Sequence, residues 1–222
     1  MALIVIGGHS RNVGKTSVVT GLIAALPEYS WTAMKITQYG HGVCSLNGES
    51  CYCATDDHSW AISEEKDRSG ESDTSRFLVA GAARAWWVRT EQGKLAEAMP
   101  TIRRRLAESK NVILESNSIL KFVRPDLYLT VLDPATADFK KSAQEFLDLA
   151  DVVILHQLGI SELGAKSNDS KTIAEKPAWR GISLKPVAGL PMFQVRPPQY
   201  ITPEIVEFVR KKLTDRPITS LV

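Results

Sequence analysis

The chain has 222 residues, a formal net charge of +2, 44% hydrophobic residues and 23% charged residues. This composition is typical of a globular protein and excludes disordered, collagen-like and coiled-coil chains. The length favours one large α/β domain over residues 1–222 rather than two domains. The small net charge gives no reason to expect nucleic acid as a partner.

The sequence contains no apolar run that approaches the length needed to cross a membrane, about 18 residues. Its first residues, Met-Ala-Leu-Ile-Val-Ile, carry neither a basic leader nor a small-residue cleavage site. We therefore expect a cytoplasmic protein without a membrane partner. The sequence leaves open whether the protein forms a homodimer.

Apolar segments of strand length alternate with segments of helical periodicity. The first strand is expected at residues 3–6, before Gly7-Gly8, and the first helix follows from Thr16 up to Pro27. Further strands are expected at 32–36, 85–88, 111–114, 127–132, 151–155 and 192–195. Further helices are expected at 75–83, 95–106, 137–150 and 205–213. This alternation predicts a mostly parallel sheet flanked by helices.

Residues from about 37 to 74 interrupt this alternation. The stretch is polar, is rich in Gly, Ser, Asp and Glu, and has few apolar anchors. A segment of this length and composition is expected to be a functional or partly disordered loop.

The most informative motif lies between the first strand and the first helix. It reads Gly7-Gly8-His9-Ser10-Arg11-Asn12-Val13-Gly14-Lys15-Thr16, with Ser17 following. A glycine-rich turn between a buried strand and a helix, ending in Gly-Lys-Thr, is the pattern of a phosphate-binding P-loop. The residues expected to bind the nucleotide phosphates are Ser10, Arg11, Asn12, Val13, Gly14, Lys15, Thr16 and Ser17. One departure is that His9 stands where the motif usually has its first glycine.

In this interpretation the side chains and the backbone have separate tasks. Backbone N–H groups would surround the β-phosphate, and Lys15 would reach the β- and γ-phosphate oxygens. The Thr16 hydroxyl would bind Mg²⁺. The sequence therefore predicts ATP or GTP as ligand together with Mg²⁺, and it leaves the base open.

Three further segments accompany the loop. They are Met34-Lys35-Ile36, Asp73-Thr74-Ser75 before Ala80-Gly81-Ala82, and Ile113-Leu114-Glu115-Ser116. With the loop, they resemble the molybdopterin-guanine dinucleotide biosynthesis B protein family, in the same broad class as dethiobiotin synthetase and nitrogenase iron protein. The resemblance covers roughly residues 1–120 and implies a P-loop NTPase fold and a role in cofactor synthesis, with a small-molecule acceptor or a partner protein.

The departures from that family limit what the resemblance implies. The family has a cluster of histidines after the lysine, whereas this chain reads Thr37-Gln38-Tyr39-Gly40-His41. Ser116 replaces a glycine, and Ser10 stands where the dimeric iron-protein branch has a second signature lysine. A mechanism that uses a lysine from another subunit is therefore not expected.

Mg²⁺ needs more ligands than one hydroxyl, and it usually takes one or two carboxylates. Glu115 follows an apolar strand, at the end where an open α/β sheet places ligand chemistry. Asp73 is the second candidate, through the resemblance and its place at the end of the polar stretch. Lys15, Glu115 and Asp73 are thus the predicted catalytic residues, and Thr16, Glu115 and Asp73 the predicted Mg²⁺ ligands.

The polar stretch also contains His41, Cys44, Cys51 and Cys53. Thiolates and imidazoles in a polar segment favour zinc or an iron–sulfur cluster, although the spacing matches no standard site. Unliganded thiols and a redox disulfide stay open as alternatives. The sequence thus predicts a Mg²⁺-dependent P-loop enzyme that hydrolyses a nucleotide or transfers its phosphoryl group. The alternatives are a nucleotide-gated metal-binding or adaptor protein and a small-molecule kinase.

Overall fold

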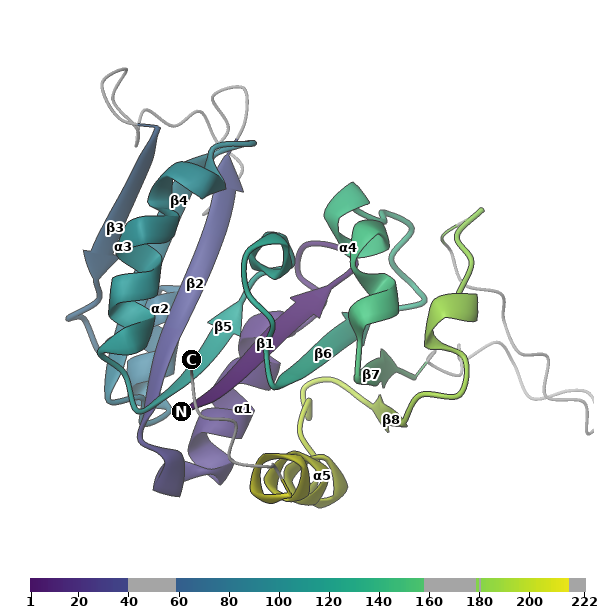
Figure 1. The fold of residues 1–222 in the computed structure, drawn as a ribbon. Coiled ribbons are helices and arrows are strands. Elements are labelled where there is room, and N and C mark those ends of the chain that lie inside the picture. Colours follow the sequence, from purple (N-terminus) through teal and green to yellow (C-terminus); the bar gives the residue numbers. More distant parts are fainter. Residues whose placement is uncertain (40–58, 158–178, 180, 216–222) are drawn as a thin grey trace, which may run out of the picture.

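A computed structural model of the chain describes residues 1–39, 59–157, 179 and 181–215. Its centre is an eight-stranded sheet with the order β3-β4-β2-β5-β1-β6-β7-β8 (Figure 1). All neighbouring strands pair in parallel except β3, which runs antiparallel to β4 at one edge. The predicted fold class, a mostly parallel sheet flanked by helices, is confirmed.

The elements follow the predicted alternation. The strands are β1 (Ala2–Gly8), β2 (Trp31–Tyr39), β3 (Trp60–Glu64), β4 (Arg84–Glu91), β5 (Asn111–Glu115), β6 (Leu127–Leu132), β7 (Val152–His156) and β8 (Met192–Val195). The helices are α1 (Lys15–Ala25), α2 (Asp73–Val79), α3 (Leu95–Ala107), α4 (Lys141–Glu145) and α5 (Pro203–Thr214). No helix in the described part of the chain is both long enough and apolar enough to cross a bilayer.

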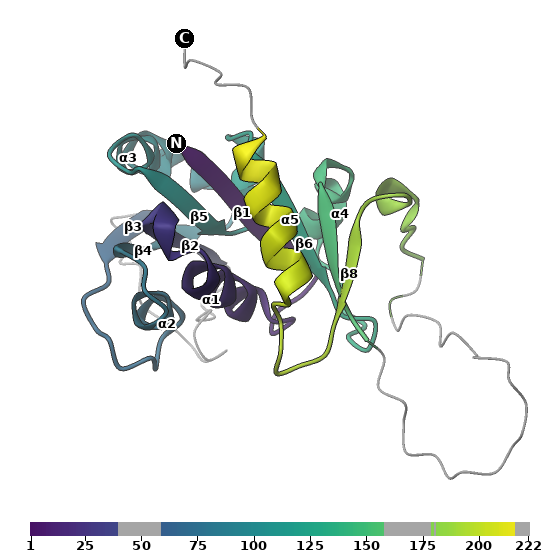
Figure 2. The same cartoon turned by 90° about the horizontal axis from the view of Figure 1, so that it is seen from below.

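Both faces of the sheet are covered, because successive residues of a buried strand point to opposite faces. Ile4 and Ile6 of β1 pack with α1, α2 and α5 on one face. Leu3 and Val5 pack with α3 and the region of α4 on the other. Figure 2 shows α1 and α2 on one side of the sheet and α3 and α4 on the opposite side. Because β2, β5, β1 and β6 pair in parallel, their carboxyl ends lie at the same end of the sheet, where ligands bind in such folds.

Two predicted segments differ in the structure. The helix expected over 137–150 is reduced to α4 and a 3-10 turn at Leu147–Leu149. The backbone before Lys141 is not helical because it is bonded to the loop after β1: Lys140 N–H donates to the His9 carbonyl at 2.8 Å. The second difference lies in the polar stretch from about 37 to 74, which contains the end of β2 and the edge strand β3.

Candidate functional site

The phosphate loop, residues 8–14, connects β1 to α1 as predicted. Two of its residues have left-handed backbone conformations, Asn12 with φ of 56° and Gly14 with φ of 82°. A Cβ atom at Gly14 would also lie 2.0 Å from the Tyr200 ring, so this position needs glycine for two separate reasons. Val13 is fully buried and belongs to the hydrophobic core beneath the loop.

Asn117 fixes the start of the loop. Its Oδ1 accepts a hydrogen bond from Gly8 N–H at 2.9 Å, and its Nδ2 donates one to the Gly8 carbonyl at 2.9 Å. Because this amide occupies the space beside β1, a Cβ at Gly7 would lie 2.2 Å from Asn117 Oδ1. Gly7 is thus explained by close packing against Asn117 just after β5, whereas a Cβ at Gly8 would lie 3.0 Å from the side chains of Val13 and Lys15.

His9, the departure from the usual motif, is fully buried. Its Nδ1 lies 2.8 Å from the Asp138 carbonyl, and its Nε2 accepts from Asp133 N–H at 3.0 Å. These two partners require a neutral ring with the proton on Nδ1. Burial lowers the pKa of His9, in agreement with a neutral ring. The imidazole thus connects the phosphate loop to the segment between β6 and α4.

Lys15 at the start of α1 is held within the loop. Its Nζ donates to the Ser10 carbonyl at 2.6 Å. Burial lowers its pKa to about 8, although the nearby Glu115 carboxylate acts in the opposite direction. Near neutral pH Lys15 is therefore still mostly a cation, in a poorly solvated position where an anion would stabilise it.

Lys35 lies at the centre of a cluster of oxygen atoms. Strands β2 and β5 pair so that Lys35 is opposite Glu115, and its Nζ donates to Glu115 Oε1 at 2.9 Å and to the Asp73 carboxylate. Thr16 Oγ1 donates to Glu115 Oε2 at 2.7 Å and lies 3.5 Å from Lys35 Nζ. The three predicted Mg²⁺ ligands therefore meet at one point, which an ammonium group occupies.

The charges in this cluster are balanced. Burial alone would lower the pKa of Lys35, but the carboxylates of Glu115 and Asp73 outweigh burial and raise it. Asp73 is available for this contact because the N-cap of α2 is the preceding residue, Ser72, which accepts a hydrogen bond from Ser75 N–H at 3.0 Å. Arg76 lies 3.7 Å from Asp73 and also donates to Ser17 Oγ at 3.2 Å.

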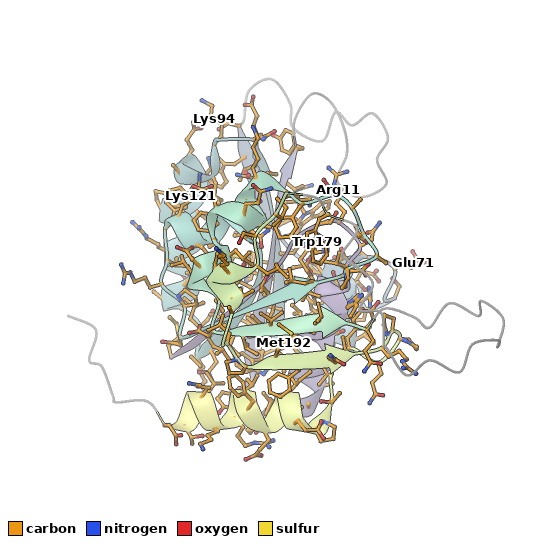
Figure 3. All side chains as sticks on the ribbon, turned by 90° about the vertical axis from the view of Figure 1, so that its right-hand side faces the viewer. Arg11, Glu71, Lys94, Lys121, Trp179 and Met192 are labelled. Atoms are coloured by element: carbon orange, nitrogen blue, oxygen red, sulfur yellow. The ribbon has the colours of Figure 1, made fainter. Side chains whose placement is uncertain are left out.

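A cavity of about 740 Å³ opens over the phosphate loop and this cluster. Its wall includes the carboxyl ends of β2 and β5, the start of α4, and Tyr200. Within the described residues, the wall carries six cationic side chains and two carboxylates. The cationic residues are Arg11, Lys15, Lys35, Arg76, Lys140 and Lys141. Figure 3 shows Arg11 on the side of the molecule toward which the strands point. The site therefore suits a highly charged anion.

The structure brings together most of the predicted site. Arg11, Asn12, Gly14, Lys15, Thr16 and Ser17 all line the cavity, as do Asp73 and Glu115. Ser10 is buried and its hydroxyl donates to Asp138 Oδ2 at 2.6 Å, so it supports the loop from behind. The predicted zinc or iron–sulfur ligands His41, Cys44, Cys51 and Cys53 lie outside the described residues. The described residues contain no group of three His, Cys, Asp or Glu side chains that could hold a metal ion.

Sequence reasoning missed several residues of the wall, among them Lys35, Lys140 and Tyr200. Lys140 was placed inside a predicted helix, and nothing in its local sequence indicates that it reaches the cavity. Tyr200 covers the loop from a segment that is distant in sequence, next to the last strand. Only the close approach to Gly14, visible in three dimensions, identifies it.

The comparisons with known proteins give no close relative. No family model and no curated protein matches the chain. Solved structures match at low sequence identity and with TM-scores below 0.5. The apo form of LpxK from Aquifex aeolicus in complex with ATP is 15% identical, with a TM-score of 0.42 over 87% of this chain and 53% of that chain. The chain thus spans about half the length of that LpxK.

The second structure is HypB from Helicobacter pylori in complex with nickel, 13% identical, with a TM-score of 0.46 over 100% of this chain and 92% of that chain. The fold of the present chain is that of a P-loop NTPase. This assignment rests on the mostly parallel sheet and on the unit of β1, phosphate loop and α1. The resemblance to the molybdopterin-guanine dinucleotide biosynthesis B family is not confirmed and stays a prediction.

Proposed function

We propose that this chain is a Mg²⁺-dependent enzyme that binds ATP or GTP and hydrolyses it or transfers its γ-phosphoryl group. One observation carries the proposal: Lys15 and Thr16 line one cavity together with Asp73 and Glu115, which are distant from them in sequence. Phosphoryl transfer needs two tasks from such residues: Lys15 would contact the phosphates, and the other three would hold the metal ion.

Lys15 and the start of α1 are suited to hold the phosphates. Main-chain N–H groups at the N-terminus of an eleven-residue helix attract anions, and Gly14 leaves room for a close approach. Lys15 would exchange the Ser10 carbonyl for phosphate oxygens, a stronger acceptor for an ammonium group. The charge that develops on the phosphoryl group in the transition state would be stabilised by the same ammonium.

The oxygen cluster fits a magnesium ion. Its donors are one hydroxyl and two carboxylates, which suit a hard cation, and in this structure a cation, the Lys35 ammonium, already sits among them. Thr16, Glu115 and Asp73 would hold Mg²⁺, which when bound neutralises phosphate charge. Lys35 and Mg²⁺ would compete for the same oxygens, so Lys35 becomes free to contact a phosphate once the carboxylates are engaged.

The extent of the cavity favours transfer to an acceptor over simple hydrolysis. Beyond the phosphate loop, its wall continues to Gln38, Gln92 and Ser118, which no phosphate-binding motif requires. Ser118 Oγ donates to Gln38 Oε1 at 3.2 Å, which gives this wall a polar surface. A small-molecule kinase is therefore the form of the proposal that we prefer. A role in cofactor synthesis rests on the resemblance of residues 1–120 alone.

The test has two parts. Calorimetry with a non-hydrolysable ATP or GTP analogue, with and without Mg²⁺, measures whether the site binds nucleotide and whether the ion contributes. Phosphate release and transfer onto candidate acceptors then distinguish hydrolysis from kinase activity. Absence of analogue binding at millimolar concentration would reject the proposal. A Glu115→Gln variant should lose the Mg²⁺ dependence, whereas Glu108→Gln, at an exposed residue just after α3, should keep it.

The metal-binding or adaptor alternative depends on His41, Cys44, Cys51 and Cys53. Metal analysis of protein purified without added metals tests it directly. Zinc or iron close to one equivalent, lost on replacing Cys51 and Cys53 by serine, would support that function over the enzyme.

A further inference from the structure

The cavity has one wall whose charges are not balanced. Lys140 precedes α4 and is half-buried, and Lys141 is the first residue of that helix. Arg11 in the phosphate loop also lines the cavity. None of these three cations forms a hydrogen bond or an ion pair through its side chain with any residue in the described ranges. Lys35, in contrast, forms ion pairs with two carboxylates.

The position of Lys140 is fixed by its backbone. Its N–H donates to the His9 carbonyl at 2.8 Å, and the carbonyl of Asp138 lies 2.8 Å from His9 Nδ1. The Asp138 carboxylate accepts the hydrogen bond of Ser10 Oγ at 2.6 Å and does not pair with Lys140. The segment therefore holds the lysine at the phosphate loop, while the acid two residues earlier in the chain is used elsewhere.

These cations also affect one another. Burial lowers the pKa of Lys140, and the nearby charge of Arg11 lowers it further, whereas the carboxylates of Asp138 and Glu115 act in the opposite direction without outweighing these two causes. An ammonium held in a partly desolvated wall next to a guanidinium is unfavourable unless an anion binds between them. The proposed nucleotide already has Lys15 and the main-chain amides for its phosphates. Arg11, Lys140 and Lys141 are in excess of that requirement.

We propose that Arg11, Lys140 and Lys141, with the Ser142 hydroxyl, form a second oxyanion subsite in this cavity, and that the phosphoryl acceptor carries a phosphate or carboxylate group that binds there. The inference rests on the proposed phosphoryl transfer and narrows its acceptor to an anionic small molecule. Lysine and arginine are the side chains that recognise phosphate and carboxylate groups, and the arginine guanidinium does so as a planar fork of N–H donors. A neutral acceptor would leave these charges without a partner.

The experiment separates this subsite from nucleotide binding. The whole chain is first saturated with the non-hydrolysable analogue AMPPNP and Mg²⁺, and inorganic phosphate or succinate is then titrated by calorimetry at constant ionic strength. We expect the saturated protein to bind at least one of these anions. Binding of phosphate alone indicates a phosphorylated acceptor, and binding of succinate alone indicates a carboxylate.

Lys140→Met keeps the length of the side chain and removes its charge. It should weaken binding of the anion to the AMPPNP complex by about tenfold or more, because a charge-assisted hydrogen bond is lost. Arg11→Met should act in the same direction. Lys110→Met is the matched control, since Lys110 is exposed and directly precedes β5, at the opposite end of the strand from Glu115. It should leave anion binding unchanged.

Each other outcome has a definite meaning. If AMPPNP does not bind, the proposed function fails before the subsite is tested, and titration of phosphate onto the free protein then decides the subsite alone. If AMPPNP binds but neither anion does, the second subsite is rejected. If Lys140→Met weakens the binding of AMPPNP as much as it weakens the binding of the added anion, Lys140 contacts the nucleotide. The assignment of Lys140 to the acceptor subsite is then overturned. Circular dichroism and thermal unfolding confirm that each variant is folded.

Discussion

The two sides of the phosphate loop differ in how their charges are satisfied. On the side of β2 and β5, Lys35 donates hydrogen bonds to Glu115 and Asp73, and Arg76 lies 3.7 Å from Asp73, so two cations balance two carboxylates. On the side of β6 and α4, Lys140 has no partner within the described ranges, although its backbone is held equally firmly. The first side is assembled without a ligand, and for Mg²⁺ to bind there the Lys35 ammonium must leave the carboxylates. The second side is complete only when an anion binds.

The largest effect is expected at Lys15, which lies between the two sides. Lys15→Ala should lower nucleotide turnover by about 1,000-fold, because the ammonium stabilises charge on the transferring phosphoryl group. The measurement is steady-state phosphate release, with Lys110→Ala as control. Undiminished turnover in a folded Lys15→Ala protein would show that this lysine has no such task.

Breaking the balanced side at Glu115 should have the next largest effect. In Glu115→Gln, Lys35 loses a buried carboxylate partner, and the unfolding free energy should fall by about 1–3 kcal/mol. Turnover should fall by about 100-fold, since a carboxylate ligand for Mg²⁺ is lost. Urea unfolding and turnover measure the two effects. Glu108→Gln breaks only an exposed pair with Arg105, and it should change stability by less than about 1 kcal/mol.

The lowered pKa of Lys15 predicts a dependence of nucleotide binding on pH. In the free protein this pKa is about 8, and bound phosphate favours the protonated form. Above pH 8 the protein must take up a proton in order to bind, so affinity should fall by up to about tenfold per pH unit. Calorimetry in buffers of different ionisation enthalpy counts this proton. Lys15→Arg stays charged and should remove the uptake.

The lowered pKa of Lys15 also affects the stability of the ligand-free protein, which should rise with pH where nucleotide affinity falls. Its pKa at Lys15 is lowered from 10.5 to about 8, so the unfolded chain holds more protons between these two values. Stability of the free protein should therefore rise with pH across that window. A curve that falls there in the wild type, but not in Lys15→Met, would contradict the assignment.

A smaller effect should separate the two sides. His9→Phe keeps a ring between Phe139 and Trp179 but removes the bonds to Asp138 and Asp133. Because these bonds position Lys140 and not Lys35, we expect turnover to fall by only about threefold, while anion binding to the nucleotide complex weakens further. Equal losses of Mg²⁺ dependence and anion binding would show that His9 supports the whole loop and not one side.

The sequence alone predicted the parts of this site that depend on local patterns. Lys15 and Thr16 follow from the loop motif, and Glu115 follows from its place at the end of an apolar strand. The contact of Lys35 with Glu115 depends on the register between β2 and β5, which no local pattern fixes. Residues 137–140 were expected to be helical because their composition allows it, but bonds to His9 override that tendency. The features that were missed are therefore tertiary contacts.

Through Tyr200, the carboxyl-terminal part of the chain forms part of the cavity wall. The Tyr200 ring lies against Gly14 before α1, and Ile201 lies against Gly21 within α1. These contacts place the segment just before α5 against the loop and α1, so a protein shortened before this point would retain every residue of the loop motif and still lack one wall of the cavity. A fragment ending at β7 is consequently not a minimal version of this protein, and grafting the first 120 residues elsewhere would not transplant its binding pocket.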